Sequence, residues 1–278
     1  MPTVPDITLN NGVAIPQLGY GVFQVKPEET VDAVTTALEI GYRHIDTAAG
    51  YRNEKEVGQA IRRSGLDPTQ VFVTSKLGSS RIGFDEALSG FDETLSALGT
   101  DQLDLFLIHW PLPTLRDYVE TWKAFERIYA DGRARSIGVS NFQIAHLQRL
   151  FEETEIVPAV NQVEAHPYLT QPSVLAFNAE HGIATEAWSP IARGAVLTDA
   201  TVGDVAAGCE KTPAQVVLRW HVQLGSIVFP KTVSPARMRE NLEIFDFELS
   251  DVDMERISDL NRDERVGPDP YSFEGPRN

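Results

Sequence analysis

Residues 103–109 read Leu-Asp-Leu-Phe-Leu-Ile-His, and residues 135–140 read Arg-Ser-Ile-Gly-Val-Ser. Each is a short, mostly apolar run that ends in a polar side chain, which is typical of a strand buried inside a parallel sheet. The segment near residues 118–129 lies between them and is long enough for a helix. Because parallel strands need such a crossover, these stretches predict one strand–helix–strand unit.

The same unit recurs along the whole chain. Eight strand-like runs are found, at 18–21, 43–46, 71–76, 103–109, 135–140, 159–162, 183–189 and 227–231. Signals for helix starts or ends lie between them, at Asn53 (with Glu56 placed for a capping box), Thr212-Pro213 and Ser234-Pro235, and at Gly41, Gly65, Gly99, Gly132 and Gly182. This alternation predicts an α/β fold with right-handed crossovers.

Eight such units favour a closed (β/α)8 TIM barrel over an open, doubly wound sheet. An open dinucleotide-binding sheet would carry Gly-x-Gly-x-x-Gly after an early strand, and Gly19-Tyr20-Gly21 lacks the third glycine. Asn10-Asn11-Gly12 predicts a β-hairpin with a type I′ turn, which we expect to cap the barrel bottom. No linker divides the chain, so we expect one domain over 1–278, with the hairpin in 1–16 and a polar tail in 262–278.

The composition limits the possible partners. The chain has 24 Lys plus Arg against 40 Asp plus Glu, a formal net charge of −16, which disfavours nucleic acid and anionic membranes. Its one cysteine, Cys209, cannot form an internal disulfide, which suits a reducing compartment. The N-terminal residues do not resemble a signal peptide, and no apolar run approaches the ~18 residues of a membrane span. We therefore expect a soluble, cytoplasmic protein.

Active sites of barrels lie at the C-terminal ends of the strands. Seven of the expected strands end in polar side chains, which are Asp46, Lys76, His109, Ser140-Asn141, Gln162, Ser189 and Lys231. A polar residue at the end of one strand is common and needs no function. Seven at the same rim should lie close together at one mouth of the barrel.

Four residues suggest the chemistry. Tyr51 is a poor acid, with an ordinary pKa of ~10, but an ammonium group at Lys76 would lower that pKa. Asp46 could keep a half-buried Lys76 charged, and His109 could orient a carbonyl oxygen or share a proton with Tyr51. The set predicts an acid directed at a carbonyl oxygen, which is half of a reduction. A hydride donor must supply the other half.

Longer motifs point to a family. They are Gly41-Tyr-Arg-His-Ile-Asp46 with Tyr51 and Asn53-Glu54, Thr74-Ser-Lys-Leu77, Leu107-Ile-His-Trp-Pro111, Ser136-Ile-Gly-Val-Ser-Asn-Phe142, Asn161-Gln-Val-Glu164 with His166-Pro-Tyr168, and Pro230-Lys-Thr-Val233 with Arg237 and Glu240-Asn241. In this order and at these separations, they resemble the aldo-keto reductase family along nearly the whole chain. The resemblance is greatest to bacterial enzymes of the diketogluconic acid reductase type.

The resemblance implies roles for residues at the mouth. It makes Tyr51 the general acid, Lys76 and Asp46 its tuning pair, and His109 the carbonyl-orienting group. A related branch that reduces carbon–carbon double bonds has glutamate in place of His109, so carbonyl reduction is expected. The nicotinamide contacts that it implies are Ser140, Asn141 and Gln162 at the carboxamide, Trp188 stacked on the ring, and Ser189 at the phosphates.

The resemblance also implies that the cofactor is NADPH. The matching residues at the adenosine end are Lys231, Thr232, Arg237, Glu240 and Asn241. A helix beginning at Ser234-Pro235 offers free N–H groups to phosphate, and the arginine suits the 2′-phosphate of NADP(H). Relatives of this branch are mostly monomers, which is the expectation here.

The family pattern places Phe23 and Trp110, with Tyr51, around the substrate. Gly78 departs from many relatives that have tryptophan there, which predicts a more open wall and puts a preference for aromatic aldehydes in doubt. Tyr271 and Phe273 of the tail could touch substrate. We expect small aldehydes and ketones, including dicarbonyls and keto-sugars, as substrates.

Two alternatives stay open. One is a regulatory protein that binds NADP(H) without turnover, since a fold does not prove activity. The other is a metal-dependent hydrolase on the same barrel, with His44, Asp46, His109 and His166 as ligands. The hydrolase leaves Tyr51 and Lys76 without a role, and we expect His44 to be a hydrogen-bonded core residue and no metal to be bound.

Overall fold

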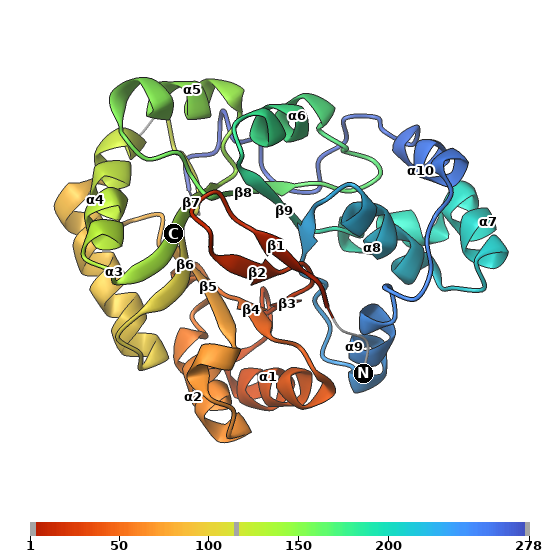
Figure 1. Ribbon diagram of the computed structural model, residues 1–278, viewed down its shortest axis with the longest axis horizontal. Coiled ribbons are helices and arrows are strands. Elements are labelled where there is room, and N and C mark those ends of the chain that lie inside the picture. Colours follow the sequence, from red (N-terminus) through yellow and green to blue (C-terminus); the bar gives the residue numbers. More distant parts are fainter. Residues whose placement is uncertain (1–3, 114–116, 276–278) are drawn as a thin grey trace.

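The computed structural model describes residues 4–113 and 117–275, and shows the expected barrel with helices around it (Figure 1). Eight parallel strands are hydrogen-bonded in chain order. They are β3 (Tyr20–Gly21), β4 (His44–Asp46), β5 (Phe72–Leu77), β6 (Leu103–Ile108), β7 (Ala134–Ser140), β8 (Val160–Glu164), β9 (Ala184–Trp188) and β10 (Ile227–Val228). A parallel bridge between Leu18 and Val228 joins the first strand to the last. The prediction of a closed (β/α)8 barrel is confirmed.

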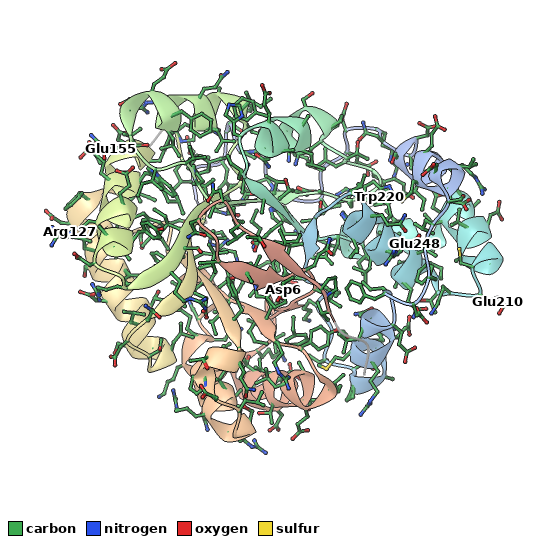
Figure 2. The ribbon with its side chains drawn as sticks, viewed as in Figure 1. Asp6, Arg127, Glu155, Glu210, Trp220 and Glu248 are labelled. Atoms are coloured by element: carbon green, nitrogen blue, oxygen red, sulfur yellow. The ribbon has the colours of Figure 1, made fainter. Side chains whose placement is uncertain are left out.

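Helices cover the outside of the barrel in Figure 1. Figure 2 shows the side chains on the same ribbon. The helices are α1 (Pro27–Ile40), α2 (Glu54–Ser64), α3 (Phe84–Leu98), α4 (Tyr118–Ala130), α5 (Ile144–Glu153), α6 (Pro172–Glu180), α7 (Ala200–Gly208), α8 (Pro213–Gln223), α9 (Pro235–Leu242) and α10 (Asp251–Ser258). Short 3-10 turns are η1 (Ala49–Tyr51), η2 (Pro68–Gln70) and η3 (Ala192–Thr198). None of the described helices is both long enough and apolar enough to cross a bilayer.

Most of the predicted helix boundaries are confirmed. Thr212 and Ser234 cap α8 and α9 through their side chains. The five glycines expected at helix ends, Gly41, Gly65, Gly99, Gly132 and Gly182, all lie within two residues of one. The capping box at Asn53 is wrong, because its side chain makes no cap hydrogen bond. The amide of Asn53 instead donates to the carbonyl oxygens of Val22 and Val25 and accepts a hydrogen bond from Thr47.

The N-terminal hairpin pairs β1 (Asp6–Thr8) with β2 (Ala14–Pro16). Its turn is not type I′, which would require positive φ at Asn11 and Gly12, since only Gly12 has it (φ 84°). The side chain of Asn11 donates instead to the carbonyl oxygen of Arg135 and to Ser136, at the start of β7. Asn10 similarly donates to the carbonyl oxygen of Pro158, just before β8. These contacts hold the hairpin against the N-terminal ends of the strands, at the barrel bottom.

Candidate active site

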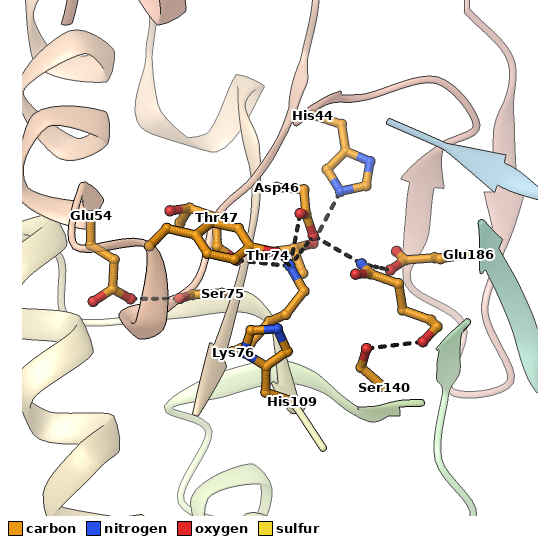
Figure 3. Close-up of polar contacts among 12 residues, drawn as sticks. His44, Asp46, Thr47, Glu54, Thr74, Ser75, Lys76, His109, Ser140 and Glu186 are labelled. Atoms are coloured by element: carbon orange, nitrogen blue, oxygen red, sulfur yellow. Dashed lines mark hydrogen bonds and ion pairs between the residues drawn. The ribbon is translucent and has the colours of Figure 1, made fainter. Parts of the chain in front are cut away.

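Four predicted residues meet at the opposite end of the barrel (Figure 3). Asp46 ends β4, Tyr51 ends η1, Lys76 lies in β5, and His109 directly follows β6. The Lys76 ammonium group is fully buried and lies 2.7 Å from both carboxylate oxygens of Asp46. It also donates to the carbonyl oxygen of Thr47 at 3.0 Å and to the Tyr51 hydroxyl at 3.4 Å. The ammonium group thus connects a carboxylate to a phenol.

Burial decides the protonation of this cluster. Burial is the largest influence on the pKa of Lys76 and lowers it, but the charge and hydrogen bond of Asp46, together with the charges of Tyr51 and Glu186, raise it by more in total, so the ammonium stays charged. Burial also raises the pKa of Tyr51 above its ordinary value, although the nearby Lys76 charge opposes this. The expectation of a net lowered pKa for Tyr51 is therefore wrong. The lysine reduces the effect of burial without reversing it, and the phenol stays protonated at neutral pH.

His109 faces Tyr51 edge to face, with ring centroids 5.8 Å apart. Burial and the Lys76 charge lower the pKa of His109 to about 3. The imidazole is therefore neutral near pH 7. A neutral ring has one N–H donor and one acceptor, so it can hydrogen-bond an uncharged carbonyl oxygen.

The residues expected at the nicotinamide form one hydrogen-bonded group at the ends of β7, β8 and β9. The Ser140 hydroxyl donates to the main-chain oxygen of Gln162 at 2.9 Å, and Asn141 donates to the main-chain oxygen of His109 at 2.9 Å. The Trp188 indole donates to the Asn141 side chain at 2.8 Å. Asn141 and Ser189 both have positive φ, at 65° and 50°. Such strained non-glycine residues are common at functional sites.

Three of the residues expected at the adenosine end, Lys231, Thr232 and Arg237, lie at the N-terminus of α9. Ser234 accepts a hydrogen bond from the main-chain N–H of Arg237, and Thr232 accepts one from the N–H of Ser234. Lys231 and Arg237 are exposed, and neither pairs with a carboxylate in the part of the chain that the structure describes. Two unpaired cations at a helix N-terminus, in a protein of charge −16, fit a phosphate-bearing ligand.

The other two residues expected there face differently. The Glu240 carboxylate accepts a 2.6 Å hydrogen bond from Thr212, at the start of α8. Asn241 is buried in the last turn of α9. The Glu240 carboxylate therefore already has a hydrogen-bond partner within the protein.

Aromatic side chains form the wall beside Tyr51. The Phe23 ring lies 5.0 Å from that of Tyr51 and is 47% exposed. Trp110 lies beside His109 and contacts Phe273 of the tail at 4.3 Å. A methyl group built on Gly78 would meet only the Ala49 side chain, at 3.8 Å, so there is open space before this glycine, as expected.

The C-terminal tail crosses the mouth of the barrel. The main-chain N–H groups of Val266 and Gly267 donate to the buried carboxylate of Glu164, at 2.5 and 3.2 Å. Of the two aromatic residues expected near substrate, Phe273 reaches Trp110, whereas Tyr271 packs on His146 and is 53% exposed. Residues 276–278 of the expected tail lie outside the described residues.

Two buried carboxyl groups were not expected in the site. Glu164 ends β8 and holds the tail, and Glu186 lies in the middle of β9 beside Gln162. The only signal in the sequence was a glutamate inside an otherwise buried strand. Such a residue is rare unless it is paired or hydrogen-bonded.

The ligands imagined for a metal hydrolase do not come together. His44 is a core residue, as expected, hydrogen-bonded to the Pro16 carbonyl oxygen and to Thr74. His166 is bonded to Glu164 instead. Among the described residues, no group of three His, Cys, Asp or Glu side chains is arranged to hold a metal ion.

The chain is similar to known proteins over nearly its whole length. The model of the aldo/keto reductase family matches residues 17–262. An aldo-keto reductase of Mycobacterium sp. (strain KMS) is 52% identical, over 97% of this chain and 98% of the relative. The methylglyoxal reductase DkgA of Escherichia coli is 44% identical, over 99% of both chains.

Solved structures show the same similarity. A Gox0644 mutant in complex with NADPH has a TM-score of 0.94 and 43% identity, covering 98% of this chain and 99% of the other. A Bombyx mori aldo-keto reductase in complex with NADP has a TM-score of 0.89 and 34% identity, covering 96% and 95%. With the family model matching most of its length and relatives well above 30% identity, this chain belongs to the aldo/keto reductase family.

Proposed function

We propose that this protein reduces aldehydes and ketones to alcohols with NADPH as hydride donor and Tyr51 as general acid. The observation that carries the proposal is the Lys76 ammonium, 2.7 Å from the Asp46 carboxylate and 3.4 Å from the Tyr51 hydroxyl. A protonated phenol beside a fixed positive charge can give up its proton when negative charge develops on a carbonyl oxygen.

Each residue of the cluster has a separate role in the proposed reaction. Dihydronicotinamide, when bound, supplies the hydride to the carbonyl carbon. Tyr51 gives its proton to the carbonyl oxygen, and Lys76 stabilises the phenolate that results. Asp46 keeps the lysine charged, and neutral His109 orients the carbonyl oxygen by a hydrogen bond. The Tyr51 pKa, raised by burial, keeps the proton available until this step.

The cofactor would lie across the mouth from β7 to α9. Ser140, Asn141 and Gln162 would bind the nicotinamide carboxamide, with the Trp188 ring against the nicotinamide. Further contacts in the proposal are Ser189 at the phosphates and Lys231, Thr232, Arg237, Glu240 and Asn241 at the adenosine end. The supporting observations are the strained backbone at Asn141 and Ser189 and the unpaired cations of α9.

The proposed substrates are small carbonyl compounds, including dicarbonyls and keto-sugars. Phe23 and Trp110 would line their pocket, and the space in front of Gly78 leaves it open on one side. Relatives named methylglyoxal reductase and glyoxal reductase, at 44% and 46% identity, support the dicarbonyls. We also propose that residues 1–278 form one domain, acting as a monomer in the cytoplasm.

Tyr51→Phe tests the proposal. NADPH oxidation, followed by absorbance with a panel of carbonyl compounds, should slow by about 10²–10⁴-fold, the usual contribution of a general acid. NADPH binding, followed by fluorescence, should persist because the lost hydroxyl acts on substrate. Tyr129→Phe, at a half-buried tyrosine in α4, is the control and should keep wild-type activity.

Two results would contradict the proposal. Full activity in Tyr51→Phe would remove the phenol from the reaction. A wild-type protein that binds NADPH tightly but oxidises it with no carbonyl compound would be the regulatory binding protein instead.

A further inference from the structure

Glu186 is a buried carboxyl group to which the proposed mechanism gives no role. It lies in the middle of β9, opposite Gln162 of β8 and Ile227 of β10, and is 0% exposed. In Figure 3, the dashed lines run from Lys76 to Asp46 and onward to Glu186. The residue is therefore connected to the ammonium group at the centre of the site.

Gln162 makes this connection. Its side-chain nitrogen donates to Asp46 Oδ2 at 2.9 Å and to Glu186 Oε2 at 2.7 Å. An amide nitrogen has two hydrogens, so both are used within the protein. Only the acceptor oxygen of this amide is left for an incoming ligand. Glu186 and Asp46 thus decide which way the Gln162 amide is turned.

The surroundings of Glu186 disfavour a negative charge. The charged neighbours are Asp46 of β4 and Lys76 of β5, while its neighbour on β10, Ile227, is apolar. Burial and the Asp46 charge together raise the pKa of Glu186 to about 8, against the opposing effects of Gln162 and Lys76. Its Oε1 atom is buried and has no hydrogen-bond partner among the described residues. A carboxylate with one hydrogen bond in such a place would be costly, so the group is protonated at neutral pH.

We propose that Glu186 is a positioning residue that must be protonated for full activity, acting through Gln162 and Asp46. This inference rests on the proposed function of Tyr51 as the acid. When Glu186 releases its proton to solvent, the buried cluster gains one negative charge. That charge opposes the negative charge that develops on the Tyr51 oxygen as the phenol gives up its proton. Reduction should therefore slow as Glu186 ionises.

The pH dependence of kcat gives the first test. In the wild type, kcat for carbonyl reduction should fall as pH rises through about 8, approaching about tenfold per pH unit. Glu186→Gln has a side chain of the same length that cannot ionise, so this fall should move to higher pH. Glu248→Gln changes an exposed glutamate far from the site and should keep the wild-type profile.

Glu186→Met separates positioning from charge. This side chain has a similar length but only a weakly accepting sulfur in place of the carboxyl oxygens, so one Gln162 N–H loses its strong partner and the amide is free to turn. NADPH should bind roughly five- to tenfold more weakly at neutral pH, the size expected for one hydrogen bond. Fluorescence titration of NADPH measures this effect without any turnover.

Infrared difference spectra test the protonation itself. The wild type should show the band of a protonated carboxyl group at neutral pH, which disappears above about pH 8 and is missing from Glu186→Gln. Superimposable pH profiles for wild type and Glu186→Gln, or no such band, would overturn the inference while the proposed function stands. A wild type that reduces no carbonyl compound would instead overturn the function, and the band would still report on Glu186.

Discussion

Arg237 is an exposed cation in a strongly acidic protein, and it has no carboxylate partner in the described part of the chain. We expect Arg237→Ala to weaken NADPH binding by about 10–100-fold and NADH binding far less, because a charged hydrogen bond is worth about 1.5–3 kcal/mol. Fluorescence titrations with both nucleotides measure the difference. Arg239→Ala, one half-turn further along α9, is the matched control. Equal losses for NADPH and NADH would exclude contact with the 2′-phosphate.

The sequence predicts which residues come together in the site better than it predicts their pKa values or hydrogen-bond partners. Asp46, Lys76 and His109 come together because the C-terminal ends of parallel strands face one mouth of a barrel. The net direction of the Tyr51 pKa depends on how deeply the phenol is buried, which strand order does not reveal. Asn53 shows the same limit, since a residue suited to cap a helix is used to join two loops instead.

The C-terminal tail contacts two residues at the mouth of the barrel directly, Glu164 and Trp188. Glu164 is fully buried, and it binds two main-chain N–H groups of the tail and the ring of His166. The tail then passes the Trp188 ring so closely that a methyl group on Gly267 would lie 2.3 Å from it. Neither contact has a local signature in the sequence, because each joins residues that are far apart along the chain.

Gly267→Ala should therefore disturb Trp188. The added methyl group must push either the ring or the tail, since it would also lie 3.0 Å from the Glu164 carboxylate. We expect weaker NADPH binding and faster cleavage of the tail by proteases. Glu274→Ala, an exposed change in the same tail, is the control. An unchanged dissociation constant and unchanged cleavage would show that the tail does not position the indole.

Helix packing gives a second prediction, in which two glycines should respond in opposite directions. A methyl group on Gly58 of α2 would lie 1.9 Å from the main-chain oxygen of Leu98, at the end of α3, whereas one on Gly203 of α7 would meet nothing within 4 Å. Gly58→Ala should lower the free energy of unfolding by ~1–3 kcal/mol by forcing the helices apart. Gly203→Ala should raise it by ~0.5–1 kcal/mol, because alanine favours helix. Urea unfolding compares the two, and a shift in the same direction would contradict the packing argument.

On the scale of the whole molecule, closure of the barrel was predictable from the number of strand–helix units. How the first and last strands meet, at the seam of the barrel, was not. The expected strand 227–231 continues as a strand only through Ile227–Val228. At this seam, a methyl group on Gly19 would lie 2.7 Å from the Phe229 ring, so the first and last strands approach closely only because the residue is glycine. A single sequence shows the glycine without showing what lies opposite it.

Stability against acid is also a property of the whole molecule. Burial is the largest cause of the lowered pKa of His44, His109 and His221, each about 3, and of His146, about 4. Unfolded histidine has a pKa near 6.5. Below that pH the unfolded chain binds protons that the native protein does not, so the free energy of unfolding falls as pH falls.

Glu186 has the opposite effect over a different range. Its native pKa of about 8 lies above the ordinary value of 4.5, so between these values the native protein holds a proton that the unfolded chain has lost. Stability from this group is complete below pH 4.5 and is lost as pH rises towards 8. With the four histidines binding protons in the unfolded chain below about 6.5, the two effects balance and the free energy of unfolding should be greatest near pH 7.

Urea unfolding from pH 8 to pH 5 measures the balance. Well below pH 6.5 each of the four histidines whose pKa is lowered should contribute a slope of about 1.4 kcal/mol per pH unit, and Glu186 should subtract one such contribution. His221→Gln should lower that slope by the contribution of one histidine, about 1.4 kcal/mol per pH unit. Its amide can still donate to the Pro190 carbonyl oxygen. His181→Gln, at an exposed histidine, should leave the slope unchanged. A slope that is the same in both variants would mean that burial does not keep His221 neutral in the native protein.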